Sequence, residues 1–179
     1  MNHYTGIGSR STPVVILNLM AQLGRMLSKQ NYILRSGHAD GADQAFERGV
    51  DFDKMQIFLP WPTFNNPPRY SALVDEEPRG FIDTQGMHCE KEAAEIAEKF
   101  HPNWGACSRG ARSLHTRNVY QVLGHDLKTP SKFVICWTPG ASRGGGTGQA
   151  LRIAEDRKIP IFDLADEVSL RTVLSKIKE

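Results

Sequence analysis

The stretch WTPGASRGGGTGQALRIAEDRKIPIF, residues 137–162, decides how the sequence is interpreted. An apolar strand predicted over 133–137 runs into a glycine cluster at 144–148, and an amphipathic helix follows from about residue 147. Ordering glycine is entropically expensive, so a cluster here indicates a backbone shape or a close approach that side chains would prevent. The strand IPIFDL comes next and completes a helix-to-strand connection.

The same alternation of strands and helices extends over most of the chain. Strands are predicted at about 3–6, at NYILRSG (31–37) and at KMQIFLP (54–60). Thr12 and Asp40 are expected to cap the helices that follow the first two strands. Strands that alternate with helices indicate parallel βαβ units. We therefore predict an α/β fold with a three-layer, doubly wound, mainly parallel sheet of Rossmann-like type.

One long stretch interrupts this pattern. Residues 60–88 are rich in proline, asparagine and charge, and they exceed the usual length of a loop. We expect either a functional lid there or elements that the pattern does not reveal. Helices are predicted at 89–100, at 111–127 and near 166–177. The chain is predicted to be one nucleotide-binding domain, 1–179, with an insertion or lid at about 60–88.

Composition argues against several classes of protein. Lys+Arg 22 against Asp+Glu 20 gives a net charge of +2, which does not favour duplex nucleic acid as a partner. No apolar run reaches the roughly 18 to 20 residues that cross a bilayer, and residues 1–10 lack the features of a secretory signal. Cys89, Cys107 and Cys136 form no CxxC pair. We expect a cytoplasmic protein with idle thiols, no metal, no cofactor and no membrane association.

Four junctions lie at the carboxyl ends of predicted strands, where open parallel sheets bind ligands. Besides the glycine cluster they are TGIGSRS (5–11), SGHADGAD (36–43) and the segment that begins at Pro60. Small residues let a ligand approach the main chain, and the N-terminus of the following helix offers unpaired N–H groups with a partial positive charge. The combination favours an anion, most of all a phosphate.

The candidate ligand-binding residues come from these junctions. Thr147 is expected to cap its helix, to bind a phosphate oxygen, or both. Arg117 is the best candidate for a cation over a phosphate because its guanidinium binds oxygens in pairs; a solvated helix arginine is the alternative. Asp43 either orients the glycine loop or binds ribose, unless it is an acid favoured by the helix dipole. The predicted set is Gly8, Ser9, Arg10, Ser36, Gly37, Gly41, Asp43, Arg117, Asn118, Pro139, Gly144, Gly145, Gly146, Thr147 and Gly148.

Further side chains are weaker candidates, and each has a structural alternative. Aromatic rings stack on nucleobases, but they more often fill the core. A lone histidine is more often structural than catalytic. These weaker candidates are Trp61, Phe64, Tyr70, Trp104, His38 and His115.

Four motifs together resemble a known superfamily. YTGIGSRSTP (4–13), LRSGHADGADQAF (34–46), LHTRN (114–118) and GGGTGQALRIAEDRKIPIF (144–162) are similar, in this order, to motifs of the Rossmann-like SLOG superfamily. That superfamily unites the recombination mediators Smf/DprA with the Lonely guy phosphoribohydrolases. The likeness covers most of the chain outside about 60–108 and is strongest to the DprA-like and small nucleotide-sensor branches. It implies binding of nucleotides, nucleotide-derived ligands or single-stranded DNA.

The phosphoribohydrolase branch cleaves the N-glycosidic bond of nucleoside monophosphates, and its motifs are partly present. Arg117 matches the arginine of its Met-His-x-Arg-Lys motif, with Asn118 in place of the lysine. The glutamate of its glycine-rich motif falls on Ala150. Glycosidic hydrolysis needs a carboxylate. A catalytic set would therefore consist of Arg117 with Asp40 or Asp43 as the substitute carboxylate.

Three functions remain open on this basis. The first is binding of a nucleotide or nucleotide-derived phosphate ligand at the glycine-rich edge of the sheet. The second is a nucleotide N-glycosidase, a hydrolase, against which Ala150 counts. The third is a DprA-like mediator that binds single-stranded DNA, which is not favoured because strand binding needs a basic groove with stacking aromatics. Whether the chain is an enzyme is open, and related domains often form homo-oligomers.

Overall fold

The strands of the chain form one mainly parallel sheet. The computed structural model describes residues 2–68, 71–74 and 77–177. Within these residues the sheet has seven strands in the order β4-β5-β3-β2-β1-β6-β7, and every neighbouring pair is parallel except β4 with β5. The strands are β1 (Asn2–Gly6), β2 (Tyr32–Ser36), β3 (Met55–Leu59), β4 (Ser71–Val74), β5 (Glu77–Asp83), β6 (Val134–Cys136) and β7 (Ile161–Asp163).

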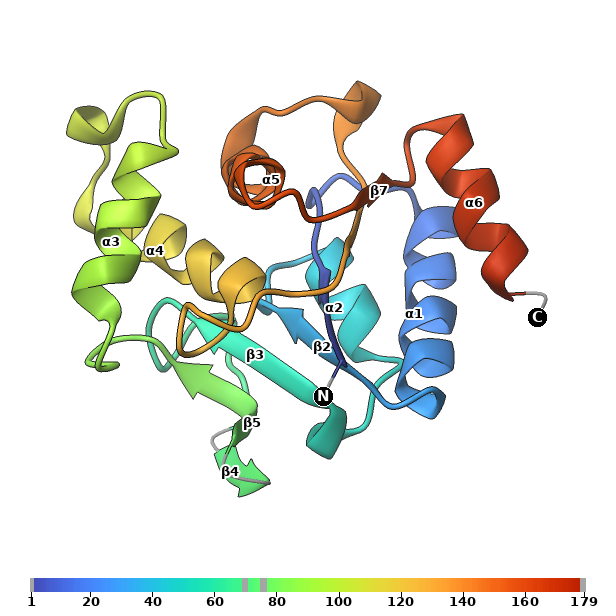
Figure 1. Cartoon of the computed structure of the whole chain (residues 1–179), viewed down its shortest axis with the longest axis horizontal. Helices are drawn as coiled ribbons and strands as arrows, with labels where there is room; N and C mark the ends of the chain where they lie inside the picture. The colour runs from blue at the N-terminus through green and yellow to red at the C-terminus, as the bar shows by residue number, and fades with distance from the viewer. Residues whose placement is uncertain (1, 69–70, 75–76, 178–179) are drawn as a thin grey trace.

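Helices cover both faces of this sheet (Figure 1). One buried cluster joins α1, α2 and α6 to one face, and a second joins α3, α4 and α5 to the other. The predicted three-layer α/β fold is therefore confirmed. None of the helices in the described part of the chain combines the length and apolar character needed to cross a membrane. The helices are α1 (Val14–Lys29), α2 (Ala42–Glu47), α3 (Glu90–Lys99), α4 (Arg109–Leu123), α5 (Gly145–Asp156) and α6 (Glu167–Ile177).

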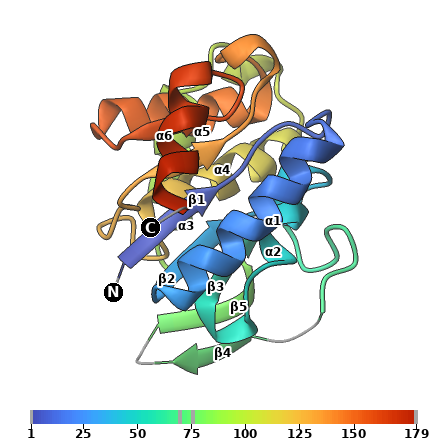
Figure 2. The same cartoon turned by 90° about the vertical axis from the view of Figure 1, so that its right-hand side faces the viewer.

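Strand order reverses at β1. From β1 the chain first builds outward through β2 and β3, and later returns to place β6 and β7 on the other side of β1. Figure 2 shows β2, β3, β5 and β4 following one another on one side of β1. The loop after β1 stays paired to the end of β6, because the Ile7 N–H donates to Ile135 O (3.2 Å) and the Ser9 N–H to Trp137 O (3.0 Å). This reversal is where doubly wound sheets bind ligands.

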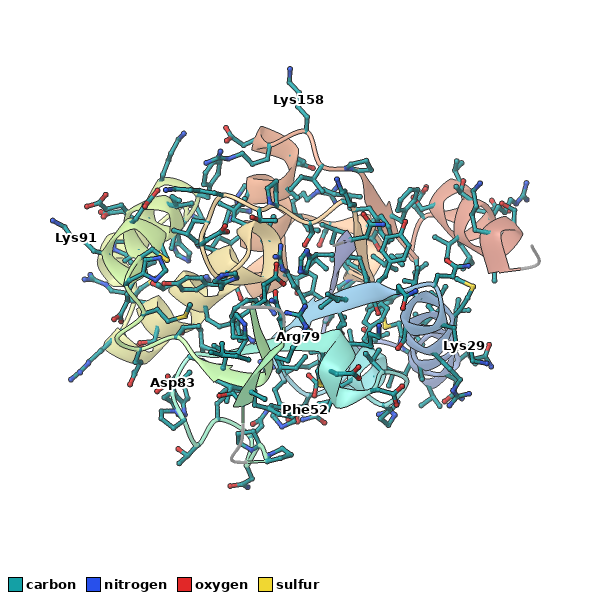
Figure 3. The ribbon with its side chains drawn as sticks, turned by 60° about the horizontal axis from the view of Figure 1, so that its bottom comes forward. Lys29, Phe52, Arg79, Asp83, Lys91 and Lys158 are labelled. Carbon is teal, nitrogen blue, oxygen red and sulfur yellow. The ribbon has the colours of Figure 1, made fainter. Side chains whose placement is uncertain are left out.

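β4 and β5 lie within the stretch 60–88, which therefore contains elements that the sequence pattern did not reveal, one of the two alternatives expected there. β5 pairs in parallel with β3, and β4 returns antiparallel beside it at the sheet edge. Pro78 and Gly80 hide β5 from propensity-based prediction because both residues are depleted in strands. Arg79, labelled in Figure 3, is 1% exposed and its Nε donates to Asp53 O (3.1 Å), so this strand is integral to the fold. A lid at about 60–88 stays a prediction.

Three helix caps expected from the sequence are absent. α1 begins after Pro13, and the Thr12 hydroxyl instead donates to Ser9 O (2.7 Å). α2 follows Gly41 without a side-chain cap, while exposed Asp40 accepts a hydrogen bond from Gln44 Nε2 (3.2 Å). α5 begins at Gly145, so Thr147 lies within its first turn and does not cap it. Backbone geometry at proline and glycine sets all three helix starts.

Close packing of α1 on α2 generates a first prediction. A Cβ at Gly24 would lie 2.6 Å from Phe46 O, a backbone atom that cannot rotate away. We expect Gly24→Ala to lower the free energy of unfolding by about 1–3 kcal/mol through overpacking, measured by urea denaturation. The matched control is Gly110→Ala in α4, where a Cβ meets nothing within 4 Å, and it should be neutral or stabilising. Equal effects of the two substitutions would contradict this account of the packing.

Candidate functional site

A cavity of about 570 Å³ lies where the strand order reverses. This volume is in the range of small-molecule sites. Its walls come from the loop after β1, the start of α2, one face of α4, and the segment 138–147 that leads into α5. The structure thus brings together most of the residues predicted from separate junctions. Those that line the cavity are Gly8, Ser9, Arg10, Asp43, Arg117, Asn118, Pro139, Gly144, Gly145, Gly146 and Thr147.

The other predicted residues do not line this cavity. The Ser36 hydroxyl is buried and donates to Gly6 O (2.6 Å). Gly37 leaves room for Arg117, since a Cβ there would lie 1.4 Å from Nη1. Gly148 packs against the backbone, with Arg143 O at 1.9 Å from an added Cβ. Packing and backbone shape thus explain these positions, and the same holds for Gly41, which has a φ of +87°. Exposed Asp40 also lies outside the cavity.

The glycines that open α5 face free space. An added Cβ would have no heavy atom within 4 Å at Gly145, only Ser142 Oγ at 3.8 Å for Gly144, and only Asn118 Nδ2 at 3.9 Å for Gly146. The φ of +63° explains why position 145 is a glycine. Close packing does not explain a glycine at any of the three positions. No side chain in the described part of the protein caps α5, so the N–H groups that precede Gly148 keep their hydrogen-bonding capacity. Such an arrangement has the chemistry to bind an anion.

Arg117 forms part of the cavity wall from a buried position. It is 5% exposed, and its Nη1 donates to Gly37 O and to Phe58 O (3.4 Å). Asp43 Oδ2 lies 3.9 Å from Nη1, and the guanidinium lies 5.6 Å from the Phe64 ring centre. The buried Nε has no hydrogen-bond partner in the described part of the chain. Burial lowers the pKa of Arg117, against the attraction of the nearby carboxylates.

Asp43 is the carboxyl group in the cavity wall. It is 4% exposed, and burial raises its pKa from 3.8 to about 7, although the Arg117 guanidinium opposes the shift. The Ala39 N–H donates to Asp43 Oδ2 (3.4 Å) and helps to orient the group. A carboxyl with a pKa near neutrality can both give and accept a proton at physiological pH. Ala150, 1% exposed, also lies in the wall and contributes no carboxyl.

Asn118 holds the glycine loop to α4. Its Nδ2 donates to Gly146 O (3.1 Å) and to Gln149 Oε1 (3.0 Å). Gln149 is fully buried, and its Nε2 donates to Ala97 O (3.0 Å). The same Gln149 Oε1 lies 3.0 Å from Nδ1 of His115, whose pKa is lowered by burial. Gln149 was not predicted from the sequence, because a lone glutamine in a helix carries no motif.

The structure places some of the weaker candidates in the cavity wall and others outside it. Phe64 and His115 line the cavity, whereas Trp61 and Trp104 do not, and Tyr70 lies outside the described residues. His38 binds Glu47 Oε2 through its Nδ1 (2.7 Å), which is a structural contact.

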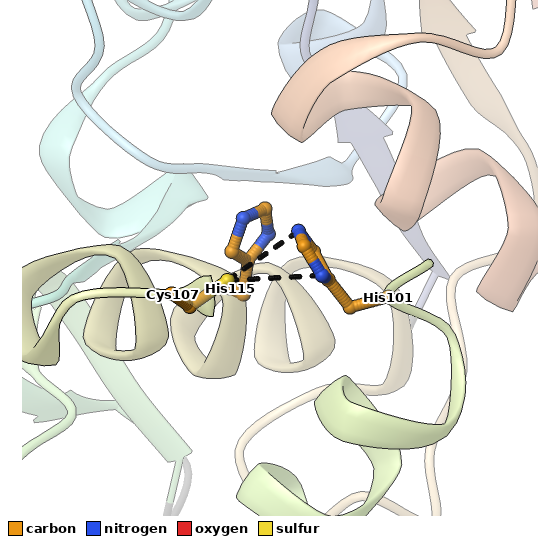
Figure 4. A group of neighbouring side chains, drawn as sticks. All are labelled: His101, Cys107 and His115. Atoms are coloured by element: carbon orange, nitrogen blue, oxygen red, sulfur yellow. Dashed lines mark hydrogen bonds between the residues drawn. The ribbon is translucent and has the colours of Figure 1, made fainter. Parts of the chain in front are cut away.

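The structure also gathers three metal-ligating side chains that sequence spacing did not connect. His101 from the loop after α3, Cys107 from the loop before α4, and His115 on α4 place ligand atoms within 4.8 Å of one another (Figure 4). Their spacing in sequence matches none of the common zinc motifs.

Comparison with known proteins yields a structural match. No protein-family model and no curated protein matches the sequence. The chain is similar to a solved structure of DNA processing protein A from Helicobacter pylori, with a TM-score of 0.50 and 18% identity over 98% of this chain and 72% of that one. This chain has the DNA processing protein A fold. The fold that the resemblance to the SLOG superfamily implies is thereby confirmed.

The match extends over the segment that the motifs left out. Because 98% of this chain is covered, the comparison includes most of 60–108, for which the sequence showed no resemblance. The Helicobacter protein is described as having a unique mode of binding single-stranded DNA. At 18% identity the comparison establishes architecture, and the cavity has to be interpreted from its own residues.

The buried carboxyl in this DNA processing protein A fold gives a pH prediction. Because the folded state holds the Asp43 proton more tightly than the unfolded chain, the contribution of this group to stability is complete below about pH 4 and is lost as the pH rises to about 7. The Tm of Asp43→Asn minus that of the wild type should therefore increase between these pH values and then level off. The control is Asp40→Asn, which removes an exposed charge nearby. A constant difference for Asp43→Asn across this window would contradict the burial argument.

Proposed function

We propose that the cavity binds a nucleotide or nucleotide-derived ligand with its phosphate on the first turn of α5. The observation that carries the proposal is the open space in front of Gly144, Gly145 and Gly146 at an uncapped helix N-terminus. A phosphate there accepts hydrogen bonds from backbone N–H groups and lies at the positive end of the helix dipole. The Thr147 hydroxyl lies in the same turn and lines the cavity.

Cationic and aromatic groups support this assignment. Arg10 and Arg117 both line the cavity, and the buried Nε of Arg117 is an unused donor for an anionic oxygen. Phe64 offers an aromatic ring in the same wall, against which a base can stack. It belongs to the stretch 60–88, for which the sequence predicts a lid or hidden elements. We assign the phosphate to the glycine loop and the base to the side of Phe64.

A second candidate function is N-glycosidic hydrolysis of a nucleotide, and Asp43 favours it. Ala150 occupies the position of the glutamate that the phosphoribohydrolase branch uses. Asp43 lines the same cavity with a pKa of about 7, so it can activate water or protonate a leaving base. Arg117, 3.9 Å from Asp43, would then stabilise phosphate or developing negative charge. Asp40, outside the cavity, has no place in this hypothesis.

A ligand panel tests the proposal and separates the three functions. Nucleoside 5′-monophosphates, the matching nucleosides, inorganic phosphate and single-stranded oligonucleotides are each added to the full chain in thermal-shift and calorimetric titrations. A nucleotide binder is stabilised by a nucleotide, less by its nucleoside, and yields no product. A hydrolase releases free base, detected by chromatography. Preferential binding of oligonucleotides with a steep salt dependence, or no binding at all, would overturn the proposal.

A charge placed on the glycine loop gives a sharper prediction. In Gly146→Asp, the carboxylate lies in the first turn of α5, where the helix dipole favours an acid by about 0.3–1 kcal/mol. Stability should hold or rise, while nucleotide affinity should fall about tenfold or more through like-charge repulsion. The control is Val168→Asp, an acid added to the first turn of α6 at an exposed position, which should leave affinity unchanged. Unchanged affinity in Gly146→Asp would place the phosphate elsewhere.

Base release tests the second candidate function directly. If the nucleotide panel yields free base, Asp43→Asn should reduce kcat by about a hundredfold or more, because the amide cannot transfer the proton. Asp40→Asn, the same chemical change outside the cavity, should retain wild-type turnover. Equal turnover of both variants would exclude Asp43 as the catalytic acid or base.

A further inference from the structure

We propose that His101, Cys107 and His115 bind one Zn²⁺ ion, whose fourth position is open to water. The ligand atoms of the three side chains lie within 4.8 Å of one another (Figure 4). Three protein ligands with an open position is the arrangement of catalytic zinc sites, whereas structural sites use four. The inference does not depend on the proposed nucleotide function, because it rests on different contacts.

The spacing of the sulfur and nitrogen atoms fits a single metal ion. With the usual Zn–S and Zn–N bond lengths and tetrahedral angles, two such ligands lie about 3.6 Å apart. Cys107 Sγ lies 3.6 Å from Nε2 and 3.7 Å from Nδ1 of His101. The rings of His101 and His115 are 4.3 Å apart between centroids. Small side-chain rotations therefore suffice to close the site around an ion.

The surrounding hydrogen bonds fix the tautomer of His115. Gln149 Nε2 donates to Ala97 O (3.0 Å), and Gln149 Oε1 accepts from Asn118 Nδ2 (3.0 Å), so the orientation of the amide is settled. His115 Nδ1, 3.0 Å from this oxygen, must then donate to it. Nε2 of His115 is left with a free lone pair. A histidine whose other ring nitrogen donates to a fixed acceptor is what a metal ligand requires.

His101 and Cys107 supply the other two ligand atoms from one loop. The Asn103 N–H donates to His101 Nδ1 (3.1 Å), so this nitrogen carries the lone pair of the neutral ring. Zn²⁺ bound at Nδ1 takes the place of that hydrogen bond. Cys107 binds as the thiolate, so the step is Zn²⁺ plus thiol giving the Zn–S bond and one proton, which leaves to solvent.

The environment also favours zinc over harder cations. One thiolate and two imidazoles suit Zn²⁺, whereas Mg²⁺ and Ca²⁺ prefer oxygen ligands. Trp104 lies beside both imidazoles, with ring centroids 6.0 Å from His101 and 6.4 Å from His115. The Arg112 guanidinium lies 5.5 Å from the Trp104 ring and its Nη2 donates to Trp104 O (3.4 Å), which anchors the indole. The three ligands are therefore held in a partly apolar setting.

His115 belongs to both the proposed zinc site and the wall of the nucleotide cavity. Cys107 and His101 do not line that cavity. Substituting either of these two thus tests metal binding without altering the residues proposed to hold the nucleotide. Loss of zinc with retained nucleotide binding, and the reverse, are separate outcomes.

The test uses the full chain, stripped with a chelator, reloaded with Zn²⁺ and dialysed. Metal analysis should give one zinc per chain, and Co²⁺ in its place should show a thiolate charge-transfer band and the intense visible bands of tetrahedral cobalt. Cys107→Ser and His101→Ala should lower Zn²⁺ affinity at least about a hundredfold. The control, His88→Ala, removes an exposed histidine outside the cluster and should keep full occupancy. Thermal melts verify that each variant is folded.

Two results would overturn the proposal. One is a wild-type chain that retains no stoichiometric zinc and gives no thiolate band with Co²⁺. The other is zinc affinity in folded Cys107→Ser equal to that of the wild type, which would place the ion at other ligands.

Discussion

The pairing of β1 with both β2 and β6 is the constraint on which the site depends. Because both partners are parallel to β1, their carboxyl ends meet at one edge of the sheet. The chain leaves β1 and β2 toward helices on one face, and reaches β6 from a helix on the other. Backbone hydrogen bonds from Ile7 and Ser9 continue the β1–β6 pairing beyond the strands, so the two loops cannot separate. The cavity is the space that this geometry leaves open.

Helix α4 connects the parts of the site. It carries a run of buried polar residues, and two of them, Arg117 and Asn118, form hydrogen bonds with other elements. Arg117 reaches β3 and the loop after β2, and Asn118 holds the carbonyl of Gly146 at the start of α5. Gln149 accepts hydrogen bonds from Asn118 and His115 through one oxygen atom. The glycine loop and the proposed zinc site thus share one hydrogen-bonded unit.

The electrostatics of the cavity are mixed. Asp43 and Arg117 are both buried beside it. Burial raises the pKa of Asp43 and lowers the pKa of Arg117, and each shift favours the neutral form of the group. A phosphate bound as proposed would favour the protonated form of Asp43, since protonation removes the repulsion between two negative charges. Binding would then be accompanied by proton uptake at Asp43. A static cluster of exposed lysines would bind phosphate but could not do this.

The sequence by itself determined the α/β architecture and the glycine-rich junctions, because apolar periodicity and glycine clusters are local properties of the chain. It also supplied the motifs of a superfamily whose fold the structure has. The side-chain caps expected at Thr12, Asp40 and Thr147 were wrong, since proline and glycine occupy the N-cap positions of those helices. β5 was hidden because Pro78 and Gly80 suppress strand propensity, while its pairing with β3 is a long-range interaction. Only the tertiary structure shows that Asp43 lines the cavity and Asp40 does not. It alone brings Gln149 to His115, and His101 and Cys107 to the same histidine. Which side chains of distant segments share a buried space depends on how the layers pack, and sequence spacing does not encode that.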